Sequence, residues 1–195
     1  MNIFATRKDP ERAALDLQEI HRKMILESAQ LLSTAHVKLD GRQPGYGATH
    51  ANHPSAVWVR DSPDNYRWLV EYTLSATAEF KRRNGQEHKS GIMVKEKLRK
   101  PPRNYEDTTL GLTPVRLAIA PAYRINEGKN WREVIAAYRW YYCVDKLFFD
   151  SDKTNWFEWN RWHNAHPPEW FVSFWEERGL VLVEDGNNFS MRVPK

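Results

Sequence analysis

The feature that most constrains the fold is a long helical periodicity near the start of the chain. Asp9-Pro10-Glu11 is a typical helix start, because Asp caps a helix, Pro fits its first turn and an acidic residue is favourable at the positive end of the helix dipole. Apolar or small residues then recur every three or four positions, as on one face of a helix: Ala13, Leu17, Ile20, Met24, Ser28, Leu31 and Ala35. The pattern predicts one helix of about 26 residues that ends near His36.

Two further helices are predicted downstream. Pro54 begins the shorter one, with Asn52 or His53 as its cap. The longer one begins at Ser62-Pro63-Asp64 and ends at Gly85. Its predicted buried stripe consists of Tyr66, Leu69, Val70, Thr73, Leu74, Thr77 and Phe80.

The second half of the chain has weaker patterns. Residues 86–124 hold four prolines and few periodic signals, so we expect a long basic loop with one or two short turns. A helix is predicted from Asn130 onward, where Glu133 completes a capping box. A short helix from Pro168 to Gly179 is followed by a predicted β-hairpin.

The predicted fold class is mainly α: a compact helical domain with a long first helix, plus a small C-terminal β-hairpin. The 195 residues suit about one domain. Within it we distinguish a helical core over 1–125, which contains the basic loop 86–124, from a Trp-rich helical part over 126–195. We expect both parts to pack on the same core.

Composition excludes several classes of protein. Hydrophobic residues make up 41% and charged residues 28% of the chain, unlike disordered, collagen-like or coiled-coil chains. Apolar runs such as Leu117–Tyr123 are far shorter than the ~20 residues of a membrane-spanning helix, so no membrane partner is expected. Met1–Lys8 is unlike a secretory signal, and the single Cys143 permits no intrachain disulfide. We therefore expect a cytoplasmic protein.

Positive charge is concentrated in one segment. The net charge of the whole chain is only +4, but Lys81–Arg103 holds nine Lys and Arg against two Glu, an excess of seven. Such a segment is typical of contact with a polyanion. Seven of the nine Trp lie instead in residues 131–195, where we expect most of them to pack in a core, the alternative being stacking surfaces for unpaired bases.

Glu27 is the most informative single residue. It lies three residues after Met24 and four before Leu31, so it borders the apolar stripe of the first helix and should be partly buried. Lys23, four residues earlier, is close enough to be its partner, and Arg22 or His21 lies at the same end. Two interpretations follow: an ordinary Glu–Lys pair on a helix surface, or a functional carboxylate with a perturbed pKa.

Two HxxH pairs, His50 with His53 and His163 with His166, raise the question of a metal. Zinc sites usually add a carboxylate or thiolate, so we expect no metal here. Asn52-His53-Pro54 is better interpreted as a cap and turn, or as a polar group that contacts a phosphate or a base edge. No phosphate-binding glycine loop is present, and no cofactor is expected.

Three segments together resemble a known family. Three elements occur in this order: Met1-Asn2-Ile3-Phe4, the run from His21 to Leu32 with its K-x-x-x-E and A-Q-L-L, and Asn52-His53-Pro54 with Trp58 four residues after the proline. They are similar to the pyrimidine-dimer DNA glycosylase (endonuclease V-like) family, in its phage-encoded branch. The resemblance covers residues 1–85 well and later segments more loosely.

The resemblance implies a mostly helical enzyme that flips a nucleotide out of duplex DNA and cleaves the glycosidic bond of a damaged or modified pyrimidine through an imine. Glu27 matches the glutamate that assists this chemistry in the family. The amine is the N-terminal one in well-known members, here that of Met1, with Lys23 as the alternative. A monomer, in the host cytoplasm if phage-encoded, is expected. The predicted DNA contacts are His21, Arg22, His50, Asn52, His53, Trp58, Arg60, Arg82, Arg83 and Lys89.

Two other functions stay open. The first is a non-catalytic DNA- or protein-binding module, because Glu19 and Ile20 stand where the family often has basic residues. The second is an enzyme that modifies DNA bases, which needs a pocket for a co-substrate.

Overall fold

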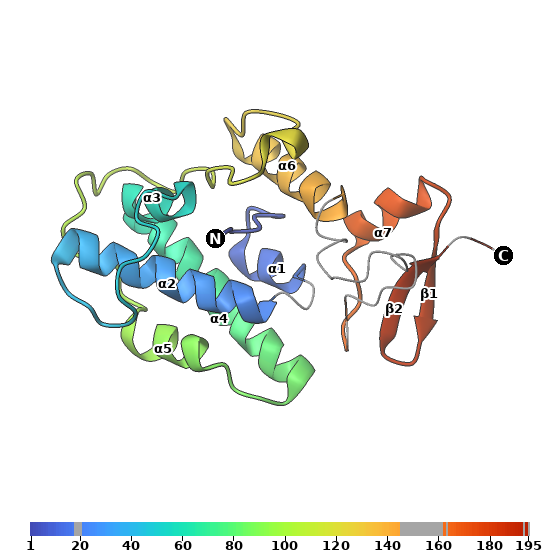
Figure 1. Cartoon of the computed structure of the whole chain (residues 1–195), viewed down its shortest axis with the longest axis horizontal. Coiled ribbons are helices and arrows are strands. Elements are labelled where there is room, and N and C mark those ends of the chain that lie inside the picture. The colour runs from blue at the N-terminus through green and yellow to red at the C-terminus, as the bar shows by residue number, and fades with distance from the viewer. Residues whose placement is uncertain (18–20, 145–161, 163, 193, 195) are drawn as a thin grey trace.

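The computed structural model describes residues 1–17, 21–144, 162, 164–192 and 194, and this part of the chain is mainly helical, which confirms the predicted class (Figure 1). The helices are α1 (Pro10–Leu15), α2 (His21–Asp40), α3 (Pro54–Asp61), α4 (Pro63–Asn84), α5 (Lys89–Lys97), η1 (Pro121–Tyr123), α6 (Trp131–Val144) and α7 (Glu169–Glu176). The strands β1 (Val181–Asp185) and β2 (Asn188–Arg192) pair antiparallel. Among the described helices, none has both the length and the apolar character needed to cross a membrane.

The prediction of a single long first helix is wrong. α1 ends at Leu15 and α2 begins at His21. The Asp16 carboxylate at the end of α1 accepts hydrogen bonds from the Thr6 hydroxyl at 2.8 Å, from Arg7 Nε at 2.9 Å and from Trp170 Nε1 at 2.9 Å. All three donors lie outside α1, so the helical pattern of the sequence does not reveal these contacts. Tertiary bonds therefore override the helical period at this point.

α3 begins as predicted, and α4 both begins and ends as predicted. The His53 side chain caps α3 and the Ser62 hydroxyl caps α4 by accepting from the Asp64 N–H at 3.0 Å. Gly85 ends α4 with φ of 66°, the left-handed conformation that glycine adopts most easily. α4 packs against α1, α2, α3 and α5 and so forms the centre of the helical core.

The segment 86–124 is not the loop with short turns that its prolines indicate, because it contains the nine-residue helix α5. The reason lies in the packing of α5 on α4. A Cβ added to Gly91 would lie 2.3 Å from the side chain of Thr77, so only glycine permits this close approach. Past α5 the chain is irregular and is anchored to α4, where the Asn65 side chain bonds Thr113.

The C-terminal elements lie at one end of the molecule, with α6 between them and the η1 segment (Figure 1). Asn130 and Glu133 form the predicted capping interaction, since the Glu133 N–H donates to Asn130 Oδ1 at 3.0 Å. Trp162 is buried against Phe171, with ring centroids 4.5 Å apart. Trp156 and Trp159 lie outside the described residues.

Candidate functional site

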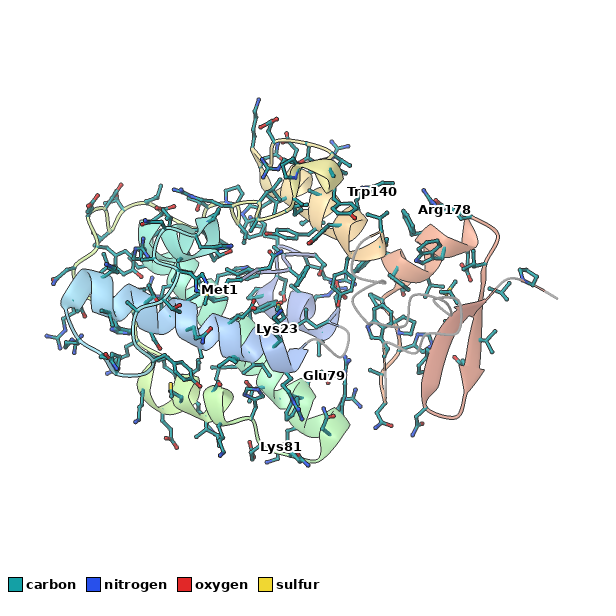
Figure 2. The ribbon with its side chains drawn as sticks, in the orientation of Figure 1. Met1, Lys23, Glu79, Lys81, Trp140 and Arg178 are labelled. Carbon is teal, nitrogen blue, oxygen red and sulfur yellow. The ribbon has the colours of Figure 1, made fainter. Side chains whose placement is uncertain are left out.

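The Glu27 carboxylate lies where α2 passes the first residues of the chain. Its Oε2 accepts from the Asn2 peptide N–H at 3.0 Å, and its Oε1 lies 3.8 Å from Lys23 Nζ. The Glu27 side chain is only 12% exposed, so the predictions of partial burial and of Lys23 as its partner are confirmed. Met1 and Lys23 are both labelled over α2 in Figure 2. A carboxylate, an ammonium group and a peptide N–H therefore meet at one point.

Asn2 fixes the chain next to this carboxylate. Its Nδ2 donates to the Ala118 carbonyl at 3.2 Å, and its Oδ1 accepts from the Ile3 N–H and from the hydroxyl of Tyr138, both at 2.9 Å. Tyr138 is fully buried in α6. These bonds fix Asn2, whose peptide N–H donates to Glu27, so Met1, the preceding residue, is held beside Glu27.

His53 forms another side of the site. Its Nδ1 accepts from the Ser55 N–H at 3.2 Å, which makes the imidazole the N-cap of α3. Burial lowers the pKa of His53, the positive charges of the chain N-terminus and of His50 lower it further, and Glu27 raises it. The charges of Glu27 and of the amine therefore act on this ring, although His53 is 26 residues from Glu27 in the sequence.

The loop before α3 carries His50 and Asn52, which are both exposed. His50 has φ of 47°, an uncommon backbone conformation for a residue other than glycine. Arg60 Nη2 donates to the Ala51 carbonyl at 2.7 Å and so braces this loop from α3. Burial lowers the pKa of Arg60, which is half-buried. Arg60 thus supports the loop that presents His50 and Asn52.

Two predicted DNA contacts are wrong. Trp58 is fully buried, donates its indole N–H to the Thr113 carbonyl and packs edge-on against Trp68, so it belongs to the core. Arg83 is also buried, where its Nε donates to Glu79 at 2.6 Å and its Nη1 to the Leu17 carbonyl at 2.9 Å. Neither side chain is available to a phosphate or a base.

Three other predicted contacts, Arg22, Arg82 and Lys89, are at the surface. Arg82 is exposed, but two of its nitrogens donate to Glu79 at 2.7 Å and one of them also to the Asn164 carbonyl, so it serves internal contacts. Arg22 and Lys89 are exposed on α2 and α5. His21 is the first residue of α2, and its side chain lies outside the described residues.

Exposed cations continue along α5 and the irregular chain after it. Lys81 pairs with Glu87. The exposed basic residues beyond this pair are Lys89, Lys95, Lys97, Arg99, Lys100 and Arg103. The positive charge that is concentrated in this part of the sequence is therefore exposed on α5 and on the chain just after it.

A cleft of about 820 Å³ lies beside the site, lined by α3 and by parts of the chain around 106–117 and 124–129. Arg116 and Leu117 form part of its wall. The same stretch holds Asn2, because the Ala118 carbonyl accepts from Asn2 and the Arg116 carbonyl accepts from Tyr138 at 3.3 Å. The cleft and the surroundings of Glu27 therefore share a wall.

No protein-family model, no curated protein and no solved structure matches this chain. The glycosylase resemblance thus stays a prediction. Among the described residues, no three or more His, Cys, Asp or Glu side chains are grouped to hold a metal ion. Sequence reasoning missed Asn2 and Tyr138, which are 136 residues apart, because the pattern around Tyr138 indicates only a buried helix face.

Proposed function

We propose that this protein is a DNA glycosylase, with or without an associated lyase step, that acts on a damaged or modified pyrimidine in duplex DNA. The observation that carries the proposal is the position of the Glu27 carboxylate between the Asn2 N–H at 3.0 Å and Lys23 Nζ at 3.8 Å, with Met1 fixed beside it. A carboxylate held next to an amine suits nucleophilic catalysis through an imine. The family resemblance supports the same residue.

In the proposed reaction, the neutral amine attacks C1′ of the flipped nucleotide and forms a C–N bond. The glycosidic C1′–N1 bond breaks, and its electron pair leaves with the pyrimidine, which then takes a proton from water. The Glu27 carboxylate accepts a proton from the attacking nitrogen. When the sugar ring opens, the nitrogen lone pair completes the C1′=N bond and the proton on Glu27 passes to O4′.

The α-amine of Met1 is the better candidate for the nucleophile. The sequence argument for Lys23 required desolvation, but its side chain is 54% exposed. Met1 is half-buried and anchored through Asn2.

Borohydride trapping tests the proposal. Duplexes that each carry one modified pyrimidine are incubated with the protein and borohydride, and we expect a covalent protein–DNA adduct. Glu27→Gln abolishes the adduct, whereas Glu71→Gln, which changes an exposed carboxylate on α4, leaves it intact. An extra residue before Met1 abolishes the adduct if the α-amine is the nucleophile, and Lys23→Gln does so if the lysine is. Absence of both adduct and released base across the panel overturns the proposal.

A second candidate, an enzyme that modifies DNA bases, is favoured by the cleft of about 820 Å³ that shares a wall with the Glu27 site. Its lining combines basic and acidic side chains, among them Arg116 paired with Asp61 at 2.7 Å, so the cleft supplies polar groups of both charges to a co-substrate. Mass spectrometry of the nucleosides after reaction separates the candidates. A glycosylase releases a free base, a modifying enzyme yields a nucleoside of changed mass, and a binding module leaves the DNA unchanged.

A further inference from the structure

His53 has a fixed tautomer. Every peptide N–H is a hydrogen-bond donor, so the bond from the Ser55 N–H to His53 Nδ1 at 3.2 Å requires an unprotonated Nδ1. The proton of the neutral imidazole therefore lies on Nε2. Protonation of Nδ1 breaks this cap and puts a cation at the positive end of α3, so the fold favours the neutral ring.

The Nε2–H of His53 is the second polar group of this ring. Among the described residues it has no hydrogen-bond partner, and it is not one of the polar atoms sealed from solvent without a partner. The ring is half-buried, which limits its motion. Burial and the positive charges of the N-terminus and His50 lower the pKa of His53 against the opposing effect of Glu27, in agreement with a neutral donor.

We propose that His53 is a further catalytic residue, which donates its neutral Nε2–H to the carbonyl oxygen next to the glycosidic nitrogen of the departing pyrimidine. The inference rests on the proposed function. In that reaction, negative charge develops on the base when the C1′–N1 bond breaks, and the adjacent carbonyl oxygen carries much of it. A preorganised donor at that oxygen stabilises the transition state more than the ground state. His53 donates a hydrogen bond and keeps its proton.

The proposal also sets a requirement on the substrate. The base must carry a carbonyl group adjacent to the glycosidic nitrogen, which thymine, uracil, cytosine and their derivatives share. A pyrimidine analogue without that carbonyl offers no acceptor to Nε2–H. We therefore expect its excision to be slow in the wild-type protein and insensitive to changes at His53.

Two substitutions distinguish the role of His53 as the N-cap of α3 from its role as a hydrogen-bond donor to the base. His53→Asn keeps an N-cap acceptor, because Asn is among the best capping residues, but removes the group at the position of Nε2. His53→Gln extends an amide N–H toward that position. We expect H53N to unfold at the wild-type temperature and to release the base about 10²- to 10³-fold more slowly, the usual effect of losing one such donor. H53Q recovers part of this loss.

An abasic-site duplex provides the decisive control, because it has no base to release. The wild-type protein and H53N should form the borohydride adduct with this duplex at equal rates. Asp9→Ala removes the exposed cap of α1, where the Asp9 carboxylate accepts from the Arg12 N–H at 2.8 Å, and should leave base release unchanged.

Each remaining outcome is decisive. If H53N releases the base as fast as the wild type, His53 is not the donor, while the proposed function stands. If H53N slows adduct formation equally on the abasic duplex and on the base-containing duplex, His53 acts on the amine or the fold instead, and the inference fails. If the wild-type protein forms no adduct and releases no base, both proposals fail.

Discussion

Removal of the charge of Glu79 should destabilise the fold by about 3 kcal/mol. Glu79, which is labelled in Figure 2, lies in α4 and is 8% exposed. Its carboxylate binds Arg83 Nε at 2.6 Å and Arg82 at 2.7 Å. Burial by itself raises the pKa of Glu79, but the hydrogen bonds and charges of Arg82 and Arg83 outweigh it and lower the pKa from 4.5 to about 2. A difference of roughly 2.5 pKa units between the unfolded and the folded protein corresponds to about 3 kcal/mol of folding free energy.

The lowered pKa of Glu79 also fixes how the stability of the fold depends on pH. A carboxyl group whose pKa is lowered on folding stabilises the protein fully above its unfolded pKa, and this contribution is lost as the pH falls from 4.5 toward about 2. About 1.4 kcal/mol should be lost by pH 3.5. Glu79→Gln leaves Arg83 buried without its charged partner, and measured costs of breaking such pairs are about 3–5 kcal/mol.

Urea unfolding of the wild type and of Glu79→Gln at pH 7 and pH 3.5 provides the assay. The difference in unfolding free energy should be about 3 kcal/mol at pH 7 and smaller by about 1.4 kcal/mol at pH 3.5. Glu71→Gln, on an exposed face of the same helix, should change little at either pH. A difference below about 1 kcal/mol at pH 7, or one independent of pH, refutes the reasoning.

Three further predictions concern packing, the anchor of Met1 and the basic surface. Gly91→Ala should cost about 1–3 kcal/mol in urea unfolding because of its contact with Thr77, and the added change Thr77→Ser should recover part of this cost. Tyr138→Phe removes the donor to Asn2 Oδ1, so we expect a loss of about 1 kcal/mol in stability and slower adduct formation in the trapping assay. Neutralisation of Lys95 and Lys97 should weaken DNA binding for all sequences and reduce the salt dependence by about one unit per contacted phosphate, as measured by titration at several salt concentrations. An unchanged slope removes these two lysines from the interface.

Much of the local structure could be predicted from the sequence. The signals at the ends of α3 and α4, from Pro54 and Ser62 to Gly85, depend only on residues within one or two turns, and the structure confirms them. The partial burial of Glu27 and its contact with Lys23 follow from helical spacing alone. These features could be predicted because the residues that interact are only a few positions apart in the sequence.

The remaining features depend on contacts between distant residues, so only the tertiary structure decided them. The break between α1 and α2 follows from bonds that Asp16 accepts from Thr6, Arg7 and Trp170, and α5 packs where Gly91 meets Thr77. Trp58 and Arg83 have the residue types of DNA contacts but point into the core.

The sequence by itself determined the mainly helical class, the start of α3, both ends of α4 and the segment of concentrated charge, because periodicity, capping and composition are local properties. Only the tertiary structure decided that Asn2, Glu27 and His53 lie around one site. Asn2 donates hydrogen bonds to Glu27 in α2 and to the Ala118 carbonyl and accepts one from Tyr138, and these bonds close loops of up to 136 residues. Closure of such loops depends on the packing of the whole core, which no local pattern contains.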